Sequence, residues 1–277
     1  AWALDSMGVA AWCQGDMAGA ERLIDEALGI YSELGRKASI GMCLADLTPV
    51  LISKGEVQRA IAGAQQAVAM MRSVDGQSML TASLCYLGAA LIAAGDLVEA
   101  RDALIEAIRR AQQYEYINFA MTAFYYFAEL LVVESLGLEP AAALEHRCGA
   151  VELLTCVRTH IQAWQIFRDK ATALLGEIAP LLPPAVLAAA EEIGEKRTIA
   201  ELVDVLLKSE SNGSSAAELR TSSVVGTEMN KTMVEPLTMQ ELTVLRLVGA
   251  GHSNQDIALE LVITQGTAKW YVSQILG

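Results

Sequence analysis

Side chains suited to binding chemistry gather in the last forty or so residues of this chain. Helical spacing places Gln265, Thr267, Lys269, Trp270 and Ser273 on one outward face. A lysine ammonium suits phosphate oxygens or guanine edges, and a serine hydroxyl both donates and accepts hydrogen bonds. An indole can stack on a sugar or contact a thymine methyl group. This chemistry fits contact with double-stranded DNA.

Three short helices must position these side chains. A capping box at Thr238 and Glu241 predicts the start of the first helix, and Ser253 with Asp256 predicts the start of the second. Thr264 can cap the third. Backbone amides at the helix starts near Ser253 and Thr264 are suited to bind phosphate. One small apolar core is expected from Leu242, Leu245, Val248, Ile257, Ala258, Leu261, Ala268, Val272 and Ile275.

This segment resembles the LuxR-type helix-turn-helix, whose usual pattern runs LT.RE.EVL.L...G.SN.EIA..L.IS..TVK.H...I. The chain departs from the pattern at Gln240, Ala268 and Tyr271, and none of these breaks the apolar face. The matching residues are Leu237, Thr238, Glu241, Val244, Leu245, Gly251, Ser253, Asn254, Ile257, Ala258, Leu261, Ile263, Thr267, Lys269 and Ile275.

The resemblance implies that the third helix is the recognition helix, with Lys269, Trp270 and Ser273 where bases or phosphates usually lie. It also adds Asn254, beside Ser253, to the expected DNA contacts. A homodimer on DNA is implied as well. The family pattern continues past Gly277 into a fourth helix, which commonly carries the dimer contacts.

Other interpretations of this segment stay open. From residue 236 onward, two cations, Arg246 and Lys269, stand against three anions, which is a weak electrostatic footprint for a DNA-binding domain. Helix-turn-helix shapes also occur in domains that bind no DNA, and region 4 of sigma factors has a similar helix pattern. The alternative function is a protein-interaction scaffold whose terminal helices form a docking module.

Most of the remaining chain repeats with a period of 40 residues. Each unit is expected to be a helix, a tight turn and a second helix, which stacks on its neighbours. The pattern resembles a tetratricopeptide repeat, lengthened from the usual period of about 34 residues. Pro49 is expected to kink the helix that contains it. The recurring positions include Gly15, Gly55 and Gly95; Ala20, Ala60 and Ala100; Ala27, Ala67 and Ala107; and Gly8, Thr48 and Gly88.

The fold class is therefore predicted to be all-α, with four parts. Residues 1–135 form the tetratricopeptide-like repeats, and 136–207 an irregular helical extension with helices at roughly 159–177, 184–193 and 197–207. Residues 208–236, rich in Ser, Thr, Gly and Asn, are expected to be a flexible linker. Residues 237–277 form the helix-turn-helix, truncated before its last helix.

This order of parts is similar to that of the large ATP-binding LuxR-type regulators, the MalT-like group. In that group an NTPase module precedes the repeats, and an inducer binds the repeat region. This chain contains no G....GK[ST] motif and begins within a repeat at Ala1. We therefore expect a fragment that lacks the NTPase module and is not itself an enzyme.

The resemblance implies that an effector ligand or a protein partner binds the array. Phe124 and Phe127 occupy packing positions, whereas Tyr125 and Tyr126 are expected to point elsewhere and to line the effector site. Arrays of this kind bind ligands on their concave face. Tyr125 and Tyr126 are therefore the predicted effector-binding residues.

Composition limits the remaining classes of function. The net charge of −13 argues against contact of the array with DNA or with an anionic membrane. The uncharged run from Gly76 to Gly95 is long enough to span a membrane, but it coincides with the first helix of a repeat. The cysteines form no CxxC pair and no histidine stands at zinc spacing, so neither a metal nor a cofactor is expected. The chain is typical of a cytoplasmic helical protein.

Overall fold

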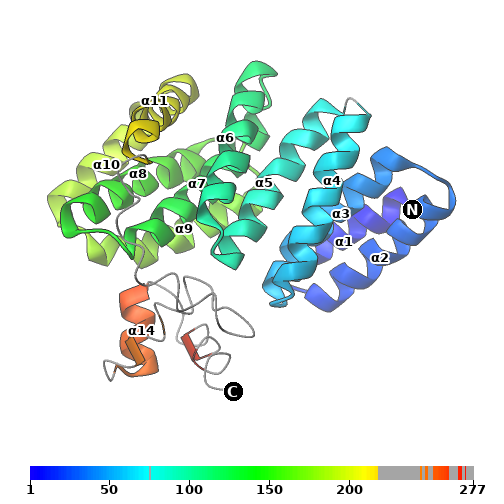
Figure 1. The fold of residues 1–277 in the computed structure, drawn as a ribbon, viewed down its shortest axis with the longest axis horizontal. Helices are drawn as coiled ribbons and strands as arrows, with labels where there is room; N and C mark the ends of the chain where they lie inside the picture. Colours follow the sequence, from blue (N-terminus) through cyan, green and yellow to red (C-terminus); the bar gives the residue numbers. More distant parts are fainter. Residues whose placement is uncertain are drawn as a thin grey trace.

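The computed structural model describes residues 1–74 and 76–217, and at the C-terminal end residues 244, 247–248, 252–261, 268–269 and 272. All regular structure among them is helical, so the protein is all-α, as its sequence predicts. Consecutive helices pack against one another in a repeat-like array (Figure 1). The array consists of α1 (Trp2–Cys13), α2 (Met17–Glu33), α3 (Lys37–Ser53), α4 (Val57–Ser73), α5 (Gln77–Ala94), α6 (Leu97–Gln113), α7 (Ile117–Ser135), α8 (Pro140–Thr159), α9 (Gln165–Ile178), a short 3-10 turn (Ala179–Leu181), α10 (Pro184–Lys196) and α11 (Ile199–Ala217).

The turns follow the 40-residue period. Gly15, Gly55 and Gly95 end the first helix of successive pairs with φ of 83°, 79° and 84°, a left-handed conformation that costs glycine little. Gly35 and Glu115 have φ of 64° and 56° in the turns that lead to the next pair. Both sets of turns therefore stop a helix abruptly and send the chain back along its neighbour.

Small residues bring the two helices of a pair close together. A Cβ atom on Gly8 would lie 2.5 Å from Ile24 Cγ1, and one on Gly88 would lie 2.5 Å from Leu104 Cγ. The recurring alanines of α2, α4 and α6 are fully buried. Pro49 is buried within α3, which is a continuous helix from Lys37 to Ser53. The repeat pattern thus marks the contacts that hold each pair together.

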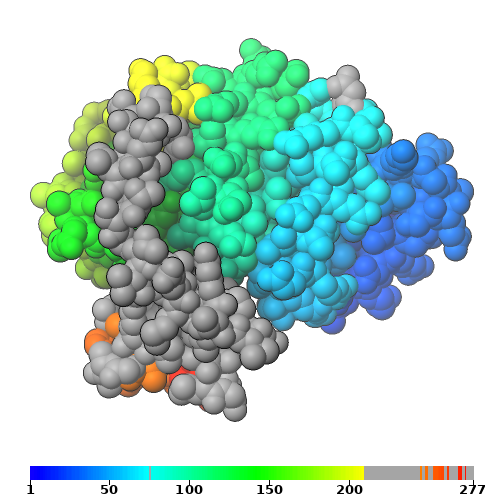
Figure 2. Space-filling model, viewed as in Figure 1, coloured from blue at the N-terminus to red at the C-terminus, as the bar shows by residue number. Residues whose placement is uncertain are grey.

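The array has an inner and an outer row of helices. Helices α1, α3, α5, α7 and α9 contact one another in series, which places them on the inner side of the curve. The curvature brings the rings of Trp12 on α1 and Phe167 on α9 to a centroid distance of 6.5 Å. Helix α11, at the end of the array, contacts α6. In Figure 2 the blue, cyan and teal helices of the array lie in contact with one another.

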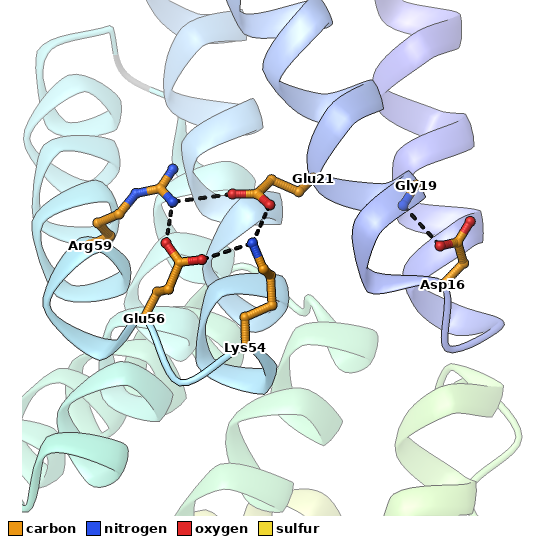
Figure 3. A network of polar contacts seen from close by, with 6 residues as sticks. All are labelled: Asp16, Gly19, Glu21, Lys54, Glu56 and Arg59. Carbon is orange, nitrogen blue, oxygen red and sulfur yellow. Dashed lines mark hydrogen bonds and ion pairs between the residues drawn. The ribbon is translucent and has the colours of Figure 1, made fainter. Parts of the chain in front are cut away.

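Charged side chains tie successive pairs together at the surface. Glu21 of α2 forms ion pairs with Lys54 and with Arg59 of α4, the latter at 3.2 Å between Oε1 and Nη1. Glu56 bridges the same two cations, with a distance of 2.8 Å to Lys54 Nζ. Figure 3 shows this network beside the Asp16 cap, which accepts a hydrogen bond of 2.9 Å from the Gly19 amide. Exposed pairs of this kind contribute little to stability.

The helical extension differs in detail from its prediction. Pro140 begins α8 as expected, because its missing amide hydrogen is not needed in the first turn. Helix α8 then continues to Thr159, so α9 begins only at Gln165. Helix α11 reaches Ala217, into the segment expected to be linker. Low helix propensity in that segment disfavours a helix only weakly, which is why composition misplaced this boundary.

Two helices, α5 and α7, are long and apolar enough to cross a membrane by length and composition. Within the array 72% of the α5 window and 67% of the α7 window are buried against other helices. Burial to this extent is what core helices of soluble proteins show. These two helices are therefore weak support for a membrane span.

Candidate nucleic-acid interface and inner face of the array

The C-terminal head contains the helix α14 (Asn254–Leu261). The Ser253 hydroxyl accepts a hydrogen bond of 3.2 Å from the Asp256 amide, and the Ser253 amide donates one of 2.9 Å to the Asp256 carboxylate. This reciprocal capping confirms the predicted helix start. The hydrogen bonds from Ser253 hold the pKa of Asp256 below its usual value. The helix therefore begins at a fixed residue, because the capping bonds fix its first turn.

The head has a small core of its own. Its buried residues come from three separate segments, and Val248 and Val272 pack against them as partly buried neighbours. Leu136, directly after α7, packs against the same cluster and so joins the array to the head. The buried members are Val244, Ile257, Ala258, Leu261 and Ala268. The apolar pattern of the described head residues is thus confirmed, while Leu242, Leu245 and Ile275 lie outside the described residues.

Three of the predicted DNA contacts can be placed. Lys269 is exposed, although its neighbour Ala268 is fully buried, so the core orients this helical segment with the lysine toward solvent. Ser253 is exposed and Asn254 half-buried at the start of α14. Thr264, Gln265, Thr267, Trp270 and Ser273 lie outside the described residues.

The head is a small helical domain. Its capped helix packs on the segment that carries an exposed lysine. The family described as "Bacterial regulatory proteins, luxR family", or GerE, matches residues 235–277. The chain is also 46% identical over 41 residues to the "Uncharacterized transcriptional regulatory protein YvfU" of Bacillus subtilis (strain 168). That match covers 15% of this chain and 20% of the relative, so the chain spans about a fifth of the relative's length. The family match falls on the C-terminal head, the part of the chain that contains α14.

The array contains a second set of functional candidates. Tyr125 and Tyr126, expected to point away from the packing, are 5% and 3% exposed and belong to the same buried cluster as Phe124 and Phe127. The expected orientation is wrong because α7 is covered by α6, α8, α5 and α9, which leaves it little free surface. Their role as effector-binding residues stays a prediction.

A cluster with two half-buried charged residues, Glu129 and Lys170, adjoins these tyrosines, and sequence reasoning missed it. The Tyr125 hydroxyl donates a hydrogen bond to Glu129. The Lys170 ammonium lies 5.5 Å from the ring centroid of Trp12 and 5.7 Å from that of Tyr125. Burial raises the pKa of Glu129, and the nearby Lys170 partly opposes that effect. The 40-residue period could not reveal this cluster, because Lys170 and Trp12 meet only through the curvature of the array.

Asp5 of α1 and Asp46 of α3 have no such cation beside them in the part of the chain that the structure describes. Asp5 is 3% exposed and its carboxyl group has a hydrogen bond with the Cys43 side chain, but its Oδ1 atom has no partner among the described residues. Asp46 is half-buried, and no cation lowers its pKa. Burial, together with the neighbouring Asp5, raises the pKa of Asp46 to about 8. This carboxyl group is therefore sensitive to pH and to any added positive charge.

We predict that Asp46→Asn flattens the dependence of array stability on pH. Between its unfolded pKa near 4 and its folded pKa of about 8, native Asp46 binds a proton that the unfolded chain does not. The free energy of unfolding therefore falls as pH rises through this window. We expect about 1–2 kcal/mol of that fall between pH 5 and pH 8 to disappear in the variant, allowing for partial hydration of Asp46.

Urea denaturation followed by circular dichroism at the two pH values measures this difference. The matched control is Asp102→Asn on α6, which removes the same charge from an exposed position and should leave the pH dependence unchanged. Equal pH dependence in Asp46→Asn and the parent chain would contradict the prediction.

Proposed function

We propose that this protein is a transcriptional regulator whose C-terminal head binds promoter DNA in the major groove. The observation that carries the proposal is the LuxR-family match over residues 235–277, which coincides with the capped α14 and the exposed Lys269. In this proposal Lys269, Trp270, Ser273, Thr267 and Gln265 face the groove. The helix starts at Ser253, Asn254 and Thr264 hold the DNA backbone.

The rest of the proposal concerns the role of the array, the group of regulators and dimerisation. We infer that it is tetratricopeptide-like, that it senses an effector ligand or a protein partner, and that the protein is a cytoplasmic member of the MalT-like group. Two heads would dimerise on DNA so that their recognition helices meet two half-sites. Helix α7 is the proposed link, because it carries Tyr125 and Tyr126 and is followed by Leu136, which packs on the head.

The first test is Lys269→Ala in the full chain. Loss of one phosphate-binding charge should weaken binding to DNA selected from a random duplex pool about tenfold and reduce the slope of log affinity against log salt by about one. Fluorescence anisotropy at several salt concentrations measures both quantities. Lys37→Ala, which removes an exposed lysine from the array, serves as the control and should bind as the parent chain does.

The alternative function is a protein-interaction scaffold with a terminal docking module that binds no DNA. The net negative charge of the chain is the observation that favours it. A scaffold would enrich no duplex sequence, and its affinities would be indifferent to Lys269→Ala. Failure of a folded chain to enrich any duplex would therefore replace the regulator by the scaffold.

A further inference from the structure

The turn between α7 and α8 is where the array meets the head. Among the described residues, Leu136 is the one array residue that packs in the head core, and it directly follows α7. Two positions earlier, Glu134 lies in an ion cluster with Arg101 of α6 and His146 of α8. The charges that fix this end of α7 therefore adjoin the contact with the head.

A single carboxylate, that of Glu134, holds both cations of this cluster. Its Oε1 atom accepts a hydrogen bond of 3.3 Å from Arg101 Nε, and its Oε2 atom pairs with the same guanidinium group. The His146 Nε2 atom lies 3.5 Å from that Oε2 atom. Arg101 also lies over the Phe127 ring, 5.2 Å from its centroid. Three helices, α6, α7 and α8, thus meet at this carboxylate.

The surroundings of His146 require a proton on both ring nitrogens. Its Nδ1 atom lies 3.0 Å from the carbonyl oxygen of Ala142, which can only accept a hydrogen bond. Its Nε2 atom faces the carboxylate of Glu134, which when ionised also only accepts. A neutral imidazole has one donor nitrogen, so it would turn a lone pair toward one of these acceptors. The arrangement therefore selects the imidazolium cation.

The charges beside His146 act in the same direction. The hydrogen bond with Glu134 raises the pKa of His146 above its usual value. Partial burial and the positive charge of Arg101 oppose this rise without cancelling it. The folded chain therefore holds this proton more tightly than the unfolded chain does.

Other charged residues meet α8 away from His146. Arg147 donates a hydrogen bond of 3.2 Å to the Ser135 hydroxyl, and Glu139 and Glu145 are exposed. Contacts from the α9 and α10 side fall on later turns or at the end of α8: Arg168 at the His160 carbonyl, Glu191 at Arg158 and Arg197 at Glu152. The proton on His146 is therefore governed by the cluster at the end of α7.

We propose that the contact between His146 and Glu134 is a pH-sensitive joint that holds the turn carrying Leu136 against the head. While His146 is protonated, the joint ties α8 to the end of α7. Loss of the proton sets a ring lone pair against the Glu134 carboxylate, so the turn loosens and the head is released. The inference rests on the proposed function only for its effect on DNA binding.

The direction of the pH dependence follows from the sign of this interaction. Because the pKa of His146 is raised in the folded chain, the stabilisation is fully present below about pH 6.5, the pKa of an unfolded histidine. It is lost as pH rises through the folded pKa. The joint is therefore closed in mildly acidic solution and opens as the solution becomes alkaline.

Hydrogen exchange of the full chain, followed by mass spectrometry at about pH 6 and about pH 8 and corrected for intrinsic exchange, measures the joint. We expect amides of the turn after α7 and of α14 to exchange about two- to fivefold faster at the higher pH, the factor that one partly exposed ion pair controls. His146→Gln, neutral at both pH values, should show the faster rate throughout. His146→Arg, charged at both, should show the slower rate throughout.

The other two histidines of the chain provide matched controls. His160→Gln, at the end of α8, and His252→Gln, in the head, should keep the pH dependence of the turn after α7. Equal corrected exchange at both pH values in the parent chain would overturn the proposal. So would an unchanged pH dependence in His146→Gln, once circular dichroism shows an intact array.

A second arm separates the joint from the proposed DNA binding. The net charge of −13 lies mostly outside the head, so a head released from the array should meet less repulsion on binding DNA. We expect His146→Gln to bind the selected duplex about two- to fivefold more tightly than His146→Arg near neutral pH. A pH-dependent joint in a chain that binds no duplex would support the joint and contradict the regulator. Equal duplex affinity of the two variants would overturn the link between the joint and the head.

Discussion

Phe167→Ala is expected to lower the free energy of unfolding of the array by about 3–5 kcal/mol, the cost typical of truncating a buried aromatic residue. Phe167 is 1% exposed. Its ring centroid lies 5.5 Å from that of Tyr125 and 5.6 Å from that of Tyr126. It also contacts Trp12 of α1 across the inner face. Removing the ring therefore leaves a cavity at the contact between α1 and α9.

Urea denaturation followed by circular dichroism measures this loss. The control is Ile161→Ala, which removes an apolar side chain that is 82% exposed near the start of α9 and should change stability little. A loss below about 1 kcal/mol in Phe167→Ala would show that the contact between α1 and α9 contributes little to the array.

Ile257→Asp should abolish DNA binding while leaving the melting of the array unchanged. Ile257 is fully buried in the head cluster, and an aspartate there would place an unpaired charge in an apolar core. The described core of the head is small, so a single buried charge is expected to unfold it. The recognition segment would then lose the support of Ala268.

Gln255→Asp is the matched control, because it introduces the same residue two positions earlier in α14 at an exposed site. It should keep the head folded and cost only the modest affinity that one added negative charge near DNA removes. Duplex binding by anisotropy and thermal melting by circular dichroism distinguish the outcomes. Retained affinity in Ile257→Asp would mean that the head does not need this core to bind DNA.

Local features of the sequence predicted much of the fold. The spacing of Gly15, Gly55 and Gly95 identified the turns, because glycine readily adopts the left-handed conformation that ends a helix. The small residues Gly8 and Gly88 identified the close helix contacts. Ser253 with Asp256 identified the start of α14, since a capping box acts within one turn. Boundaries in the extension were less well predicted, as the longer α8 and α11 show.

The candidate site residues also differ in how well the local sequence predicted their exposure. Lys269 and Ser253 are exposed in the head, as a helical pattern of buried and polar positions predicts. Tyr125 and Tyr126 were expected to point away from the packing, but the pattern of α7 alone could not show that four neighbouring helices cover this helix. A helix buried on every side has no preferred face that periodicity can detect.

The sequence by itself determined the helical repeat, its turns and the LuxR-like head, because these depend on contacts within one unit or one turn. Only the tertiary structure decided which residues meet across the inner face. The curvature of the array brings Trp12 and Phe167 together over more than a hundred intervening residues, and it brings Lys170 over the rings of Trp12 and Tyr125. Curvature is the sum of small rotations between stacked units, so no single repeat encodes it.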